Sequence, residues 1–246
     1  MQKAIRIIAV VLVLGFLGYL IVAGAISNDK AQKEAWVPAM TLGDRETAEH
    51  VFYDYTDIMC PFCNKFALAM DEHLEEFKKD YVEGKKVYYE VRLTDLLADF
   101  HPESASTVSN SQMSARGGYC AAEKNKFWEW YGWILKKLSK DYYAFDIGTA
   151  PGKELIPELG KEYFANVGED IEGLDTEYMM SCIDSEEIIA KVNKYTKKAS
   201  NIVKTGLPYY VYNSYVAPGF DGNWDIEHDW QQARLMFDAG IASKKK

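Results

Sequence analysis

The feature that most constrains the fold is a cysteine pair, Cys60 and Cys63, set between a β-prone segment and an amphipathic helix. Residues 49–56, EHVFYDYT, are rich in aromatic side chains and predict a buried strand. Residues 61–84 carry apolar side chains at spacings of three and four, which predicts a helix. Residues 86–93, KVYYEVRL, predict a second strand. This order is a βαβ unit whose cysteines lie where the first strand meets the helix.

The remaining segments extend this unit into a mixed sheet with inserted helices. Residues 36–43 predict a short edge strand, and residues 94–204 read as a long helical stretch. Residues 208–213 and 215–218 predict a hairpin, and residues 226–241 a final helix. A small mixed sheet interrupted by a helical insertion fits this order, so we expect an α/β fold.

The N-terminal segment predicts a membrane anchor. Residues 7–26 form an uncharged apolar run of 20 residues, and ~20 residues are needed to cross a bilayer. Lys3 and Arg6 precede the run and are expected to stay on the cytoplasmic side. We therefore expect residues 1–28 to form a single anchor and residues 29–36 a polar tether.

A cleaved signal peptide is the alternative for this segment, with the small residues 23–25, AGA, as the cleavage site. The apolar run exceeds the usual h-region of ~7–15 residues, which favours an uncleaved anchor. Both interpretations place the rest of the chain outside the cytoplasm, secreted or periplasmic if cleaved, where disulfides form and persist. The four cysteines permit three pairings, and they are Cys60, Cys63, Cys120 and Cys182.

The charge balance argues against a nucleic-acid partner. The chain carries 28 Lys and Arg against 37 Asp and Glu, a net charge of −9. Nucleic-acid binding requires an excess of Lys and Arg to neutralise phosphates. We therefore expect a soluble acidic surface that binds no nucleic acid.

The position of Cys60 at a helix opening predicts redox chemistry. A helix N-terminus has free N–H groups and a partial positive charge, which stabilise a thiolate. Free cysteine has a pKa near 8.5, and cysteines in C-x-x-C pairs at helix starts have pKa values of roughly 3.5–7.5. Pro61 suits the first helical turn because its missing N–H needs no partner there. Cys63 lies one turn further and is expected to be more buried, so the pair suits thiol–disulfide exchange.

A structural zinc site and an inert disulfide are the two other uses that such a pair can have. A structural zinc site needs four ligands, but the chain has one close cysteine pair and no histidines at ligand spacing. We therefore expect no metal and no cofactor. A disulfide between residues 60 and 63 closes too short a loop to stabilise the fold strongly. A non-catalytic binding or chaperone module, in which the pair is only structural, remains the alternative from another class.

Three segments resemble the thioredoxin-fold thiol oxidoreductases, and within them the DsbA-like branch. The first is VFYDYTDIMCPFC at 51–63, with an acid six residues before the first cysteine. The second is GGYCAAEKNKFWEWYGWI at 117–134, which is similar to the family's inserted helices. The third, residues 182–213, ends in a Gly-x-Pro loop before a strand. The resemblance covers about residues 37–241.

The resemblance implies a thioredoxin-like fold, βαβ…ββα, interrupted by a helical domain. Residues 37–94 and 204–246 would form the thioredoxin-like domain, and residues 95–203 the inserted helical domain. It also implies a disulfide between Cys120 and Cys182, which we expect to be structural. A regulatory bond or two free buried thiols are the alternatives.

Catalytic roles follow from the same resemblance. Cys60 is the expected nucleophile and Cys63 the resolving thiol. Asp54 is the expected buried acid, which can accept a proton from Cys63. Position 62 departs from the strongly oxidising members, which often have His there. Because Phe62 offers the thiolate no charge and no hydrogen bond, we expect a milder oxidant.

Substrate contacts are implied at two places. Pro208 is the expected cis-proline, whose loop faces the cysteines and pairs with substrate backbone, and Leu207 is the variable residue before it. Pro61 and Phe62, between the cysteines, complete the expected binding residues.

The resemblance therefore implies an enzyme of bacterial type that introduces disulfides into exported proteins with free thiols. Its partner for reoxidation would be a quinone-linked oxidase in the membrane. We expect a single-pass membrane protein with its catalytic domain on the extracytoplasmic side. It is expected to be a monomer, because no added dimerisation region is visible. A disulfide isomerase or reductase of the same fold is the nearest alternative.

Overall fold

The computed structural model describes residues 35–143, 156–167, 170–213, 215–217 and 225–243, together with residues 220 and 223. The predicted anchor at 1–28 and nearly all of the predicted tether lie outside the described residues. Within the described residues, no helix has the length and apolar character of a membrane span. The chain divides into two compact units, Met1–Trp36 and Val37–Lys246, and the fold below is that of the second.

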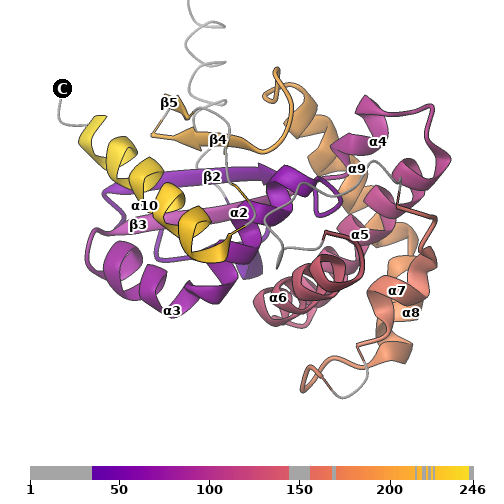
Figure 1. The fold of residues 1–246 in the computed structure, drawn as a ribbon. Coiled ribbons are helices and arrows are strands. Elements are labelled where there is room, and N and C mark those ends of the chain that lie inside the picture. Colours follow the sequence, from indigo (N-terminus) through magenta and orange to yellow (C-terminus); the bar gives the residue numbers. More distant parts are fainter. Residues whose placement is uncertain are drawn as a thin grey trace, which may run out of the picture. The chain divides into compact units, whose positions relative to one another are not determined.

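A five-stranded mixed sheet forms the centre of this unit, in the order β1-β3-β2-β4-β5 (Figure 1). The two central strands, β2 and β3, are parallel, whereas the other neighbours pair in antiparallel fashion. The strands are β1 (Thr41–Leu42), β2 (His50–Thr56), β3 (Val87–Leu93), β4 (Tyr209–Tyr212) and β5 (Tyr215–Ala217). The predicted βαβ unit, the C-terminal hairpin and the α/β fold class are therefore confirmed.

The predicted edge strand over residues 36–43 is wrong in its first half. A 3-10 helix, η1 (Pro38–Met40), occupies that part, and only Thr41 and Leu42 pair with β3. Pro38 explains the difference, because it has no N–H for a ladder and suits the first position of a helical turn.

The predicted helix over residues 61–84 is interrupted. It is observed as α2 (Pro61–Glu72), α3 (Leu74–Phe77) and the π-helix η2 (Lys78–Glu83). His73 has non-helical dihedral angles, φ −109° and ψ 23°, and its ring stacks on Trp230 at 5.0 Å between centroids. This contact with the C-terminal helix could not be read from the local apolar pattern.

Helices α2 and α10 (Ile226–Ser243) pack together and cover one face of the sheet (Figure 1). Phe52 of β2 lies at the centre of this layer, with ring centroids 4.7 Å from Phe237 and 5.5 Å from Tyr210. A Cβ atom at Gly240 would come within 2.7 Å of the Tyr212 ring, so the helix approaches β4 closely. This layer fixes the start of α2 against the sheet.

The regular elements between β3 and β4 are all helices in the residues described, joined by loops. Its elements are α4 (Leu96–Phe100), α5 (Ala105–Glu123), α6 (Phe127–Leu138), the π-helix η3 (Ser139–Tyr143), α7 (Gly160–Ala165), α8 (Thr176–Ile183) and α9 (Glu186–Ser200). A Cβ at Gly118 would lie 2.3 Å from Leu93, so α5 packs directly against the end of β3. The domain boundaries expected at 94/95 and 203/204 stay a prediction, because this part of the chain forms one compact unit with the sheet.

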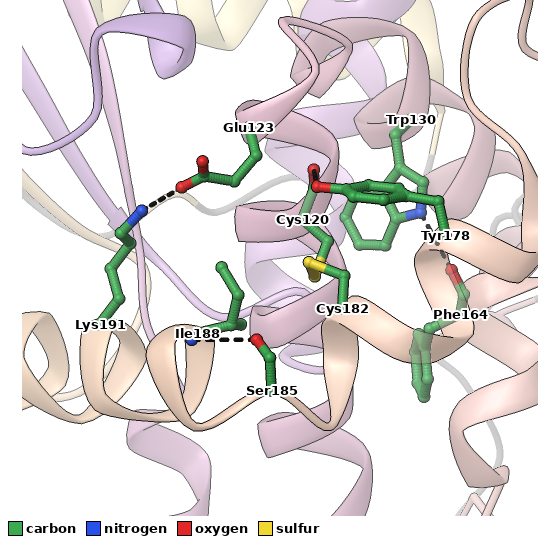
Figure 2. The surroundings of a disulfide bond; sticks show 9 residues. All are labelled: Cys120, Glu123, Trp130, Phe164, Tyr178, Cys182, Ser185, Ile188 and Lys191. Carbon is green, nitrogen blue, oxygen red and sulfur yellow. Dashed lines mark hydrogen bonds and ion pairs between the residues drawn. A yellow bond between two sulfur atoms is a disulfide. The ribbon is translucent and has the colours of Figure 1, made fainter.

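One disulfide joins Cys120 of α5 to Cys182 of α8 (Figure 2). The Tyr178 hydroxyl donates a hydrogen bond of 3.2 Å to the Cys120 carbonyl, and Lys191 of α9 forms an ion pair with Glu123. The bond closes a loop with a sequence separation of 62 residues. It therefore connects helices that are distant along the chain.

Candidate active site

Cys60 is the N-cap residue of α2, with extended dihedral angles of φ −80° and ψ 118°. Pro61 occupies the first helical position, and the Asn64 N–H donates a 2.9 Å hydrogen bond to the Cys60 carbonyl. The helix therefore begins as its sequence predicts. The Cys60 sulfur lies beside the free N–H groups of the first turn, where a negative charge is favoured.

The two cysteines are free thiols with opposite tendencies to ionise. The pKa of Cys60 is lowered, first by a hydrogen bond from the Cys63 thiol and then by the N–H groups of Cys63 and Phe62, which together outweigh burial. The pKa of Cys63 is raised well above its ordinary value, by burial and then by the hydrogen bond and charge of Cys60. Of the two thiols, Cys60 is therefore the one that ionises first, while Cys63 keeps its proton.

The sequence predicts that the helix N-terminus is the main cause that stabilises the Cys60 thiolate. The helix N–H groups do contribute, but the contact with Cys63 is the larger cause. Both side chains are nearly closed off from solvent, with 4% of Cys60 and 2% of Cys63 exposed. Low exposure strengthens each hydrogen bond, because water does not compete for it.

The loop before β4 contacts the Cys60 side chain. The Leu207–Pro208 peptide bond is cis, and the Cys60 thiol donates a hydrogen bond to the Leu207 carbonyl over 3.7 Å. Antiparallel pairing of β4 with β2, in which Asp54 lies opposite Tyr210, brings this loop next to the cysteines. The structure thus unites residues that are 147 positions apart in the sequence.

Asp54 lies on β2 behind the cysteines and is 1% exposed. Burial raises its pKa to about 7, against a lowering effect of the 2.8 Å hydrogen bond donated by the Tyr89 hydroxyl. Its other carboxyl oxygen, Oδ1, has no hydrogen-bond partner in the described part of the chain. Burial, and then the charges of Asp54 and Cys63, raise the pKa of the phenols of Tyr131 and Tyr210 well above the ordinary value. Asp54 and Cys63 therefore both act on the same two buried phenols.

Phe62 is the exposed apolar side chain of the site. About half of it, 51%, is accessible, whereas the neighbouring cysteines are buried. The Lys65 ammonium lies 4.8 Å from the centre of the Phe62 ring. An exposed ring beside a reactive sulfur suits contact with apolar segments of another protein chain. Pro61 next to it is partly buried.

A functional candidate that the sequence reasoning missed is Asp57, three residues before Cys60. It is fully buried in the turn between β2 and α2 and accepts three hydrogen bonds through its carboxylate. The available signal was an acid immediately before an apolar turn that leads into the cysteines. The sequence could not show its burial, because two of its donors come from residues 97 and 111.

The second cysteine pair does not join this site. Cys120 and Cys182, the pair implied by the resemblance, are bonded to each other between α5 and α8. Among the residues that the structure describes, no group of three or more His, Cys, Asp or Glu side chains is arranged to hold a metal ion. The groups that the structure brings together at the site are two thiols, the buried acid Asp54 and the cis-proline loop.

Comparisons with known proteins agree with this geometry. A family model described as thioredoxin matches residues 37–206, more than half of the chain. The probable disulfide bond formation protein D of Bacillus cereus is 24% identical over 225 residues, covering 87% of this chain and 88% of that protein.

Two solved structures share the fold at low identity. The oxidised BdbD of Bacillus subtilis aligns with a TM-score of 0.56 and 15% identity, over 82% of this chain and 92% of that one. The thiol-disulfide exchange protein α-DsbA2 of Wolbachia pipientis aligns with a TM-score of 0.54 and 14% identity, over 89% and 95%. Because the family model matches more than half of the chain, the chain belongs to the thioredoxin family.

Proposed function

We propose that the protein is an extracytoplasmic dithiol oxidase that introduces disulfide bonds into exported proteins through Cys60 and Cys63. The observation that carries the proposal is the position of Cys60 at the N-cap of α2 against the cis-proline loop, together with a pKa lowered at Cys60 and raised at Cys63. A stabilised Cys60 thiolate stabilises the reduced pair, so the oxidised protein tends to pass its disulfide to a substrate. The similarity to a probable disulfide bond formation protein supports the same direction.

In the first step, a substrate thiolate attacks the Cys60 sulfur of the oxidised pair. A bond forms between the substrate and Cys60, and the Cys60–Cys63 bond breaks with its electron pair on Cys63. Because the pKa of Cys63 is high, this sulfur needs a proton as it leaves. Asp54, with a pKa raised to about 7, is partly protonated near neutral pH and is the proposed donor.

In the second step, another thiolate of the substrate attacks the substrate sulfur of this mixed disulfide. The substrate disulfide forms, and Cys60 leaves as a thiolate, which its lowered pKa makes a good leaving group. The substrate dithiol has lost two electrons and two protons. The electrons reside on the reduced pair, one proton resides on Cys63, and the other is released.

Substrate binding is proposed at the exposed Phe62, at Pro61, and at the loop of Leu207 and Pro208. The Leu207 carbonyl already points at Cys60, within hydrogen-bond distance of its sulfur. A substrate chain lying along this loop would bring its thiol to the Cys60 side of the disulfide. Phe62 would contact apolar side chains of the same segment.

Membrane tethering completes the proposal. The apolar residues 7–26 would anchor a monomer, with the catalytic part outside the cytoplasm. A quinone-linked oxidase in the same membrane would reoxidise the pair by taking its two electrons. The uncharged N-terminal segment supports the membrane anchor, and the DsbA-like resemblance supports reoxidation by a membrane partner.

The test is an oxidation assay with full-length protein and a reduced, unfolded protein that contains two thiols. We expect one substrate disulfide for each oxidised pair consumed, and an equilibrium with glutathione that favours the reduced pair. A Cys63→Ser variant should accumulate mixed disulfides with exported proteins in cells, whereas Cys60→Ser should form none. An equilibrium that favours the Cys60–Cys63 disulfide would instead point to a reductase. Rearrangement of scrambled substrates without net oxidation would point to an isomerase.

A further inference from the structure

Asp57 builds the turn that presents Cys60. Its backbone carbonyl accepts a 3.0 Å hydrogen bond from the Cys60 N–H, and its Oδ1 accepts a 2.9 Å bond from the Met59 N–H. One residue thus uses both its main chain and its side chain to close the turn between β2 and α2. The position of the Cys60 N-cap therefore depends on the orientation of the Asp57 carboxylate.

The other carboxyl oxygen of Asp57 receives two donors from the inserted helices. The Leu97 N–H in the first turn of α4 donates over 3.0 Å, and the Ser111 hydroxyl of α5 donates over 2.5 Å. Asp95, the N-cap residue of α4, makes no capping bond with its own side chain. Asp57 satisfies one of the N–H groups left free at that helix start. It therefore connects two inserted helices to the catalytic turn.

The buried surroundings of Asp57 affect both its own pKa and the pKa of Cys60. Burial raises its pKa to about 7, although the three donors lower it, and the nearby carboxylate of Asp95 raises it further. The other ionisable groups beside it are Cys60 and Cys63 at the start of α2. The negative charge of Asp57 raises the pKa of Cys60. This effect is smaller than the lowering of the same pKa by the hydrogen bond from Cys63.

We propose that Asp57 is a positioning residue that ties the inserted helices to the turn before Cys60 and uses its charge to moderate the oxidising strength of the pair. The proposal rests on the function proposed above. A carboxylate that destabilises the Cys60 thiolate also destabilises the reduced form of the protein. The oxidised protein then transfers its disulfide less readily. Asp57 differs in this from Asp54, which is proposed above as the proton donor to Cys63.

The test compares Asp57→Asn with the wild-type protein. The amide keeps an oxygen acceptor in the turn but removes the charge. We expect the pKa of Cys60, measured from the pH dependence of its alkylation rate, to fall by about one unit. We also expect the equilibrium constant with glutathione to shift about tenfold toward reduced protein, because one pKa unit corresponds to a tenfold ratio.

Asp71→Asn is the matched control. Asp71 also lies on α2, near its other end, where it pairs with Lys136 at 2.9 Å. Its substitution removes the same charge and should leave both measurements at their wild-type values. If Asp57→Asn behaves like Asp71→Asn, the proposal is overturned.

Ser111→Ala provides a second, milder variant that keeps the carboxylate. Loss of the Ser111 hydroxyl removes a donor that favours the charged form, so Asp57 should ionise at higher pH. Near pH 7 the alkylation rate of Cys60 should then rise, in the same direction as in Asp57→Asn but less. A loss of stability in Ser111→Ala with no change in the Cys60 pKa would contradict the proposal, even if Asp57→Asn fails to fold.

The two proposals fail in different ways. Alkylation reports the Cys60 pKa whether or not the protein oxidises substrates. If the wild-type protein transfers no disulfide but the Asp57→Asn pKa falls, only the oxidase assignment is lost. If the wild-type protein oxidises substrates and Asp57→Asn leaves the pKa and equilibrium unchanged, only the role of Asp57 is lost.

Discussion

The thiol of Cys60 donates a hydrogen bond to the backbone carbonyl of Leu207, across a distance of 3.7 Å. This contact places the reactive sulfur between the start of α2 and the cis-proline loop before β4. When Cys60 ionises, the bond is lost and the thiolate faces a carbonyl oxygen that offers it no proton. The charge must therefore be stabilised from the opposite side, by Cys63 and the first turn of α2.

The contribution of Cys63 can be measured directly. Cys63→Ala removes the S–H donor that is the largest cause of the lowered Cys60 pKa, so that pKa should rise. Alkylation of Cys60 near pH 6 should slow several-fold, because a smaller fraction is ionised. Cys63→Ser, which keeps a hydroxyl donor, should lie between Cys63→Ala and the wild-type protein. An unchanged pKa in Cys63→Ala would mean that the helix start alone stabilises the thiolate.

Asp54 should control the leaving step of Cys63 rather than the ionisation of Cys60. In Asp54→Asn the proposed proton donor is absent, so disulfide transfer at pH 7 should slow about 10²-fold or more. The alkylation pKa of Cys60 should stay near its wild-type value, because no interaction with Asp54 is among its causes. Stopped-flow oxidation of a small dithiol gives the rate. A rate equal to that of the wild-type protein would remove Asp54 from the mechanism.

Stability should fall as the pH rises from about 4 to about 7. Asp54 and Asp57 have folded-state pKa values of about 7, raised mainly by burial from 3.8. In this window the folded protein binds more protons than the unfolded chain, so the free energy of unfolding decreases as pH increases. Each carboxyl contributes on the order of a few kcal/mol. Urea unfolding of the reduced protein at several pH values measures the slope, which Asp54→Asn should make shallower.

Phe62→His should convert the protein into a stronger oxidant. The position is half exposed and lies in the first turn of α2, so an imidazole there can be protonated near pH 6.5. A positive charge or an N–H donor beside Cys60 should lower its pKa and shift the glutathione equilibrium about tenfold toward the reduced protein. Phe62→Leu, which keeps an apolar side chain, serves as the control and should leave the equilibrium near the wild-type value.

A double variant can show whether the Cys120–Cys182 disulfide is structural or regulatory. Replacing both Cys120 and Cys182 with Ala should lower the free energy of unfolding by about 2–4 kcal/mol, because the loop between them is long. Urea unfolding gives this value. The Cys60 pKa and the glutathione equilibrium should not change if the bond is structural. A shift in either quantity would instead assign the bond a regulatory role.

Much of the fold follows from local patterns. The apolar spacing and the aromatic segments predict β2, α2, β3 and the C-terminal hairpin and helix, and the structure contains them. Cys60 and Pro61 lie at the first turn of α2 because a proline at that position and a strand before it specify where the helix begins. Local patterns do not predict the break at His73, which depends on stacking against Trp230.

The sequence by itself determined that a C-x-x-C pair lies at a helix start, and this local pattern is the basis of the proposed chemistry. Only the tertiary structure decided how that chemistry is tuned. Asp57 is buried and accepts hydrogen bonds from Leu97 and Ser111 of the inserted helices. Cys60 contacts Leu207, which follows those helices in the sequence. Such contacts depend on burial and on the approach of distant segments. Neither is encoded in the spacing of neighbouring residues.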